Sequence, residues 1–104
     1  MKARQIYHVK EFVADGAIIE IKIWQVQKSK DKPHGMKYSF AYIREDKRLI
    51  GYDNAEGKGD HRHVRDREMP YEFKNVDQLF ADFYQDIMEL RSESHESEKH
   101  KNCH

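Results

Sequence analysis

Side chains with complementary chemistry are concentrated in residues 51–65, which read GYDNAEGKGDHRHVR. Within this segment His61 and His63 are two positions apart, so in an extended strand both rings lie on one face, with Cβ atoms about 6–7 Å apart. Two imidazoles at that separation can flank one phosphate: one takes a proton from a ribose 2′-hydroxyl, and the other returns a proton to the leaving 5′-oxygen. Histidine suits both roles because its ordinary pKa lies near neutral pH. The segment therefore predicts acid–base chemistry on a phosphodiester.

Charged and polar neighbours could complete such a site. Cations neutralise the charge that builds on the phosphoryl group in the transition state, and a carboxylate fixes a histidine tautomer by accepting its second N–H. The expected catalytic residues are His61, His63, Asp53 and Asp60, and the expected phosphate-binding residues are Lys58, Arg62, Arg65 and Asn54. Asn54 could equally serve to shape the turn. The scheme requires no metal ion and no other cofactor.

Other interpretations of the same segment stay open. A His-x-His pair with a nearby aspartate resembles part of a metal site, but it supplies only two close histidine ligands and no cysteine. The basic side chains could bind the backbone of a nucleic acid without cleaving it. The segment could also be a solvated hairpin, or a surface gripped by a protein partner. Metal-independent RNA cleavage is therefore the first hypothesis, and a non-catalytic binding module is its alternative.

The totals of the chain limit its class. Its 104 residues fit one domain with a small core, and aromatic residues, at 12%, supply much of the packing area. The net charge of zero argues against a non-specific binder of polyanions. Cys103 is the single cysteine, so no disulfide can form within the chain. No segment has the pattern of a signal peptide or a membrane span, so we expect a cytoplasmic protein with no membrane contact.

Strand patterns fill the first two-thirds of the chain. Residues 4–13 and 17–27 are β-branched and aromatic, and Asp15-Gly16 between them is a hairpin signal. Isoleucines at positions 19, 21 and 23 share one face, and Trp24 then falls on the other, which indicates a bulge or two-sided burial there. Tyr38, Phe40 and Tyr42 alternate with small residues and are expected in the core. The predicted strands occupy 4–13, 17–27, 37–44, 48–53 and either 61–68 or 70–73, with a turn at 45–47.

Residues 75–91 predict one amphipathic helix. Asn75 stands at the N-cap, and Gln78 occupies the second position of a capping box. Apolar residues then recur at helical spacing. The expected fold is α+β: an antiparallel sheet of four to five strands, packed by this single C-terminal helix, in one domain over residues 1–91. Residues 92–104 are polar and are expected to form a disordered tail, whose histidines and cysteine could bind a metal only fortuitously.

Several stretches together resemble the TumE family of bacterial toxins. They are YSFAY at 38–42, RLIGYDNAEGKGDHRH at 48–63, YEF at 71–73 and VDQLFADF at 76–83. The central stretch is similar to a signature of the type YDNAHGKGHHRH, and here Glu56 and Asp60 stand where that pattern often has histidine. The resemblance covers roughly residues 5–90 and puts weight on His61 and His63. It implies the toxin of a type II toxin–antitoxin system, with a cognate antitoxin as partner. RNA as target and a homodimer are compatible with it, but RNA cleavage is inferred from the residues.

Overall fold

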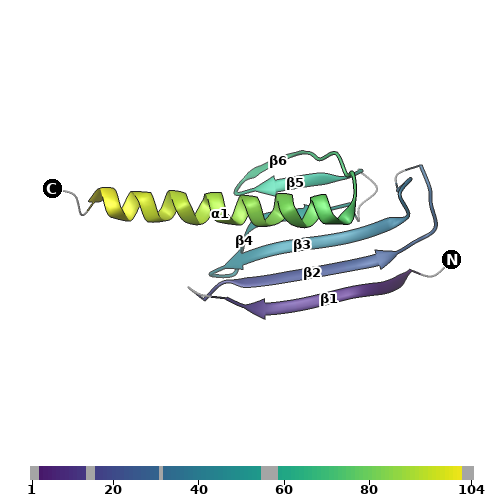
Figure 1. The fold of residues 1–104 in the computed structure, drawn as a ribbon, viewed down its shortest axis with the longest axis horizontal. Coiled ribbons are helices and arrows are strands. Elements are labelled where there is room, and N and C mark those ends of the chain that lie inside the picture. The colour runs from purple at the N-terminus through teal and green to yellow at the C-terminus, as the bar shows by residue number, and fades with distance from the viewer. Residues whose placement is uncertain (1–2, 14–15, 31, 55–58, 102–104) are drawn as a thin grey trace.

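The computed structural model describes residues 3–13, 16–30, 32–54 and 59–101, with side chains as far as residue 93. Within these residues six strands precede one helix (Figure 1). The elements are β1 (Arg4–Phe12), β2 (Ile18–Gln25), β3 (Met36–Arg44), β4 (Lys47–Asp53), β5 (His61–Val64), β6 (Arg67–Pro70) and α1 (Val76–Lys101). The α+β class is therefore confirmed, and the single helix is C-terminal as expected.

The sheet has six antiparallel strands in the order β1-β2-β3-β4-β5-β6, so each strand pairs with its neighbours in sequence. The expected count of four to five strands was wrong, because residues 61–70 hold a hairpin instead of one strand. Arg65 and Asp66 join β5 to β6, and Arg65 has a φ of 57°. A left-handed residue in a two-residue hairpin loop is usually glycine. Since this loop contains none, the sequence carried no hairpin signal there.

Two of the earlier hairpins, β1–β2 and β3–β4, agree with the sequence patterns. Glu45 and Asp46 join β3 to β4 with φ values of 53° and 64°, the backbone of a type I′ turn. β1 and β2 pair as predicted, with Gly16 at a φ of 73°, while Asp15 lies outside the described residues. The register shift that twists this pair lies at Gln5–Tyr7 of β1, opposite Trp24, and not in β2 itself.

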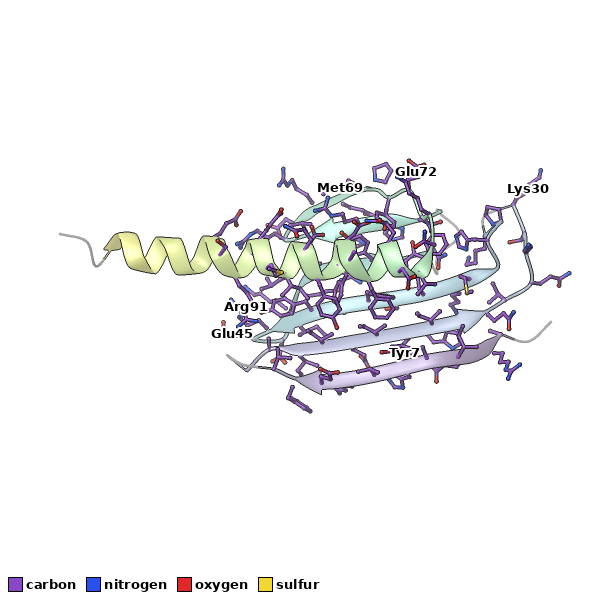
Figure 2. The ribbon with its side chains drawn as sticks, viewed as in Figure 1. Tyr7, Lys30, Glu45, Met69, Glu72 and Arg91 are labelled. Carbon is purple, nitrogen blue, oxygen red and sulfur yellow. The ribbon has the colours of Figure 1, made fainter. Side chains whose placement is uncertain are left out.

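The helix covers one face of the sheet, and the apolar core lies between them (Figures 1 and 2). The strands place alternate side chains on this face, which explains the burial of Ile19, Ile21 and Ile23 in β2 and of the three aromatic residues of β3. Tyr38, Phe40 and Tyr42 are fully buried, as expected. The core consists of Ala17, Ile19, Ile21, Ile23, Tyr38, Phe40, Tyr42, Ile50, Tyr52, Leu79, Phe83, Ile87 and Leu90.

Asn75 caps α1, as the sequence predicts. Its Oδ1 accepts a hydrogen bond from the backbone N–H of Gln78 at 2.7 Å. The capping box is not closed, because the Gln78 side chain donates to Asp82 Oδ1 at 2.8 Å instead. The helix extends to Lys101 and projects past the sheet (Figure 1). The division into a domain over residues 1–91 and a disordered tail stays a prediction. Within the described residues no helix combines the length and apolarity that crossing a membrane requires.

Candidate functional site

The register of β4, β5 and β6 brings polar side chains together on the face of the sheet opposite α1, which we call the open face. Asp53 pairs with His61, and His63 pairs with both Gly51 and Glu68. Directly paired residues of antiparallel strands share a face. Their neighbours Tyr52 and Arg62 alternate with them and lie on the helix side. We name Arg48, Asp53, His61, His63 and Glu68 the open-face cluster.

The two histidines of the cluster lie side by side, as the strand pattern predicts. Their ring centroids are 5.0 Å apart, and the ring planes meet at 77°. Both rings direct Nε2 towards Asp53: the distance is 2.8 Å from His61 to Oδ1 and 3.8 Å from His63 to Oδ2. The side chain of His63 is 20% exposed and that of His61 only 8%. His63 is therefore the histidine that a substrate reaches more easily.

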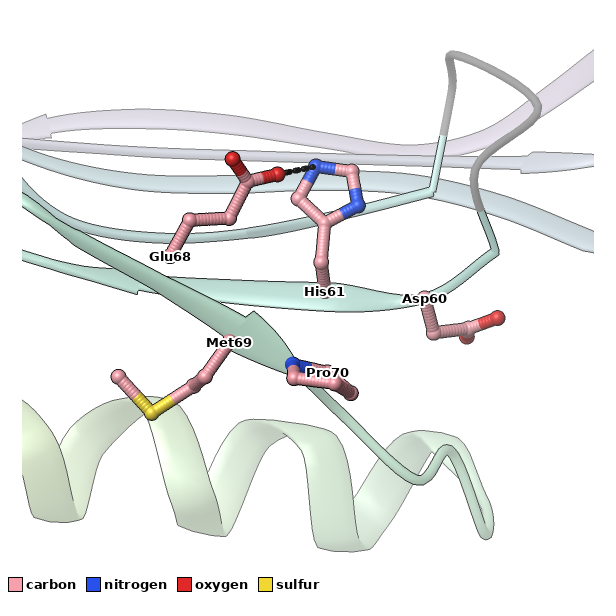
Figure 3. A pocket seen from close by; sticks show the side chains of 5 residues that line it. All are labelled: Asp60, His61, Glu68, Met69 and Pro70. Atoms are coloured by element: carbon pink, nitrogen blue, oxygen red, sulfur yellow. Dashed lines mark ion pairs between the residues drawn. The ribbon is translucent and has the colours of Figure 1, made fainter.

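His61 is fixed through both of its ring nitrogens. Its Nδ1 lies 3.2 Å from the carbonyl oxygen of Gly59. A carbonyl oxygen only accepts, so Nδ1 carries a hydrogen and donates it. Glu68 approaches the other nitrogen, with Oε1 at 3.7 Å from Nε2 (Figure 3). The ring is thus oriented by the backbone on one side and by two carboxylates on the other.

Arg48 adds a cation that the sequence analysis missed. The pairing of β3 with β4 shifts between Tyr42–Ile50 and Ile43–Arg48, which leaves Leu49 as an extra residue. Such a bulge changes the direction of a side chain, and here Arg48 Nη1 lies 3.4 Å from Asp53 Oδ2. A Cβ at Gly51 would come within 2.9 Å of Arg48 Nε. The glycine inside an otherwise regular strand pattern was the available signal of this close approach.

The surroundings of His63 favour its neutral form. Burial lowers the pKa of His63 below its ordinary value, and the positive charge of Arg48 lowers this pKa further. Asp53 and Glu68 act in the opposite direction, with smaller effects. His63 therefore presents a free lone pair at neutral pH, the state that a general base requires.

Asp60 is expected beside the histidines, but its side chain lies on the opposite side of the backbone from theirs. Its carboxylate accepts a hydrogen bond from the Tyr38 hydroxyl at 2.7 Å and lies 3.2 Å from His34 Nε2. Figure 3 shows it pointing away from His61. His34 packs against Phe73 with ring centroids 4.1 Å apart and ring planes at 43°. Asp60 thus orients Tyr38 and His34, and neither histidine of the cluster.

Asn54 has a position that favours the turn-shaping alternative. It is fully buried, accepts a hydrogen bond from the Tyr38 N–H at 3.0 Å and donates to the Met36 carbonyl at 2.8 Å. These bonds fix the chain where it leaves β4.

The expected phosphate-binding cations are not brought together. Arg62 lies on the helix side of the sheet and forms an ion pair with Asp86. Arg65 is exposed at the β5–β6 turn, 3.5 Å from Glu93. Lys58 lies outside the described residues. Among the described cations, Arg48 is the one in contact with Asp53.

A pocket of about 290 Å³ adjoins the cluster at His61 (Figure 3). It is lined by Asp60, His61, Glu68, Met69 and Pro70. The pocket gives a bound group room beside the least exposed histidine of the site.

The fold and the cluster define a small α+β protein with a histidine–carboxylate site on the open face of its sheet. Comparison with known families assigns it: the chain matches the family described as Toxin TumE over residues 2–91, and it belongs to that family. It is accordingly the toxin of a toxin–antitoxin system, for which an antitoxin is the expected partner. Comparison with curated proteins gave no match. Comparison with solved structures gave none either.

Proposed function

We propose that this toxin cleaves RNA at the open-face cluster. The observation that carries the proposal is the placement of two adjacent histidines, a shared aspartate and an arginine on a face of the sheet that α1 leaves open. Transfer of a phosphoryl group to a neighbouring hydroxyl needs a base, an acid and a positive charge near the phosphate oxygens. The cluster contains each of these groups within reach of one another.

In the proposed reaction His63 acts as the base. Its Nε2 takes the proton of a ribose 2′-hydroxyl, the 2′-oxygen forms a bond to phosphorus, and the bond from phosphorus to the 5′-oxygen breaks. Arg48 stabilises the negative charge on the phosphoryl oxygens. The products are a 2′,3′-cyclic phosphate and a free 5′-hydroxyl, so the atoms balance without water or a redox partner.

The proton for the leaving 5′-oxygen comes from His61 in this scheme. The imidazolium form of His61 has two acceptors, the Gly59 carbonyl and the Asp53 carboxylate. His61 gives its Nε2 proton to the leaving oxygen only when that oxygen replaces Asp53 Oδ1, which lies 2.8 Å from Nε2. Before that displacement Asp53 orients both rings. Arg62 is left out of the proposed site, since it lies on the other face.

The rest of the open face supports a single-stranded RNA as the substrate. Ser39 and Ala41 pair with Asp53 and Gly51, so small side chains lie next to the cluster. Farther along the same face Lys37 lies over the ring of Trp24, 5.1 Å from its centroid. A cation beside an aromatic ring is a combination that binds the phosphates and bases of a single strand.

Incubation of the purified protein with end-labelled RNA in EDTA tests the proposal. We expect fragments that end in a 2′,3′-cyclic phosphate. We expect His63→Ala to slow their formation by at least about a hundredfold, and Arg48→Ala by at least about tenfold. His8→Ala serves as the matched control, because His8 is also a strand histidine beside a carboxylate, Glu20 at 3.1 Å. Binding of intact RNA without cleavage, by protein that arrests growth, would favour the non-catalytic binding module.

A further inference from the structure

Three side chains of the open-face cluster have the arrangement of an incomplete metal centre. One ligand atom from each of Asp53, His61 and His63 lies within 4.8 Å of the others. A tetrahedral zinc ion with bonds of about 2.0–2.1 Å needs ligand atoms about 3.3 Å apart. His61 Nε2 lies 2.8 Å from Asp53 Oδ1, and His63 Nε2 lies 3.8 Å from Asp53 Oδ2. These two distances bracket that value.

We propose that Asp53, His61 and His63 bind one Zn²⁺ ion between His61 Nε2, His63 Nε2 and the Asp53 carboxylate. Two imidazoles and one carboxylate are ligands that zinc accepts. Such a mixed nitrogen and oxygen set selects first-row transition ions over Mg²⁺ or Ca²⁺, which prefer oxygen ligands alone.

The hydrogen bond of His61 to the backbone supports this assignment. Because Nδ1 donates its hydrogen to Gly59, a neutral His61 carries a lone pair on Nε2. That lone pair faces the carboxylate of Asp53, so two acceptors meet at 2.8 Å. Either a proton or a cation between them relieves this repulsion. A ligating histidine that donates its other N–H to a carbonyl oxygen is the usual arrangement around a bound metal.

Glu68 is placed to supply a fourth ligand. Its Oε1 lies 3.7 Å from His61 Nε2, and its side chain is 48% exposed, so it can rotate towards the ion without breaking a buried contact. With Glu68 included, two neutral histidines and two carboxylates balance the charge of a divalent cation. Water can occupy the fourth ligand position in place of Glu68, because His63 lies at the exposed side of the site.

Arg48 opposes the bound ion and thereby provides a sharp test of its location. The guanidinium competes for Asp53 Oδ2 at 3.4 Å and repels a cation next to it. Removing this charge is therefore expected to tighten Zn²⁺ binding, whereas removing a ligand weakens it. A cation bound elsewhere on the surface would respond to neither change.

Calorimetric titration of the EDTA-treated, dialysed full chain with ZnCl₂ tests the site. His95, His100, Cys103 and His104 are first replaced by alanine, so that the C-terminal residues add no ligands. We expect one equivalent of Zn²⁺ to bind, His63→Ala to weaken binding at least about tenfold, and Arg48→Ala to strengthen it severalfold. Asp53→Asn is the second ligand variant, and its circular dichroism shows whether it folds. His8→Ala should bind as the parent does.

The proposal is wrong if no equivalent of Zn²⁺ binds, or if His63→Ala binds as tightly as the parent. One consequence rests on the proposed function: an ion on His63 Nε2 occupies the lone pair of the base, so Zn²⁺ should inhibit RNA cleavage. The calorimetric experiment contains no RNA, and the cleavage assay is run in EDTA. Failure of the metal site and failure of the ribonuclease are therefore observed separately.

Discussion

Arg62 and Asp86 form a two-point ion pair that ties the sheet to the helix. Arg62 Nε donates to Asp86 Oδ2 at 2.8 Å, and Nη2 donates to Oδ1 at 2.5 Å. The Tyr52 hydroxyl donates to the same carboxylate, and burial together with this bond raises the pKa of Tyr52 well above its ordinary value. The sequence motif that places Arg62 between the two histidines therefore serves the attachment of α1.

Asp86→Ala should lower the free energy of unfolding by about 2 kcal/mol, because Arg62 and Tyr52 both lose their acceptor. The partial exposure of Arg62, 31%, keeps the effect below that of a fully buried pair. Urea unfolding measures it. Glu89→Ala, at an exposed position of the same helix, is the control and should change stability little. Equal effects of the two variants would mean that the pair contributes nothing to the attachment.

The β3–β4 turn offers a stabilising substitution. Glu45 and Asp46 both have positive φ, a conformation that Asn-Gly adopts with less strain. The double variant Glu45→Asn, Asp46→Gly should raise the free energy of unfolding by about 1 kcal/mol, and thermal melting measures the change. A lower melting temperature would show that the charged side chains of the turn make compensating contacts.

The pKa of His63 should lie below the ordinary histidine value in metal-free protein. Burial and the charge of Arg48 both act in this direction, so Arg48→Ala should raise the pKa of His63. Histidine ring signals followed by NMR against pH in EDTA measure both values. An unchanged midpoint in Arg48→Ala would show that the guanidinium is not held near the ring.

The same shift affects stability in acid. The folded protein disfavours the protonated form of His63. The stability that depends on neutral His63 is therefore present above the ordinary pKa of 6.5, and it is lost as the pH falls through that value towards the lowered pKa. His63→Gln should therefore remove part of the loss of stability on acidification, as measured by urea unfolding at two pH values.

Gly51→Ala tests whether the position of Arg48 matters for activity. The three atoms nearest to the added methyl all belong to the flexible Arg48 side chain, so we expect the arginine to be displaced while the fold is retained. We expect RNA cleavage to fall about as far as in Arg48→Ala, with a change in stability below about 1 kcal/mol. Full cleavage by a folded Gly51→Ala protein would remove Arg48 from the proposed site.

Local patterns predicted most of the fold. Alternation identified β2 and β3 with their buried faces, and Asn75 marked the start of α1, because these features depend on neighbouring residues alone. The β5–β6 hairpin was missed because Arg65 takes a conformation that its residue type rarely adopts. The two-residue spacing of His61 and His63 likewise fixed their common face.

Contacts across strands set the remainder of the site. The partner of Asp53 depends on the register of β4 with β5, and the direction of Arg48 depends on a bulge for which Gly51 was the available signal. Asp60 and Arg62 are adjacent to His61 in sequence, and for that reason they point to the other face. Closeness in sequence was therefore a poor guide to which charges share the site.

The simple strand order has a consequence for how quickly the toxin becomes active after synthesis. Every pairing joins strands that follow one another in the chain, so no distant segments have to find each other before the sheet exists. Topologies of this kind fold fast for their size. The open-face cluster is completed by the last two hairpins, and the fold by the docking of a single helix, so under the proposed function little delay separates synthesis from activity.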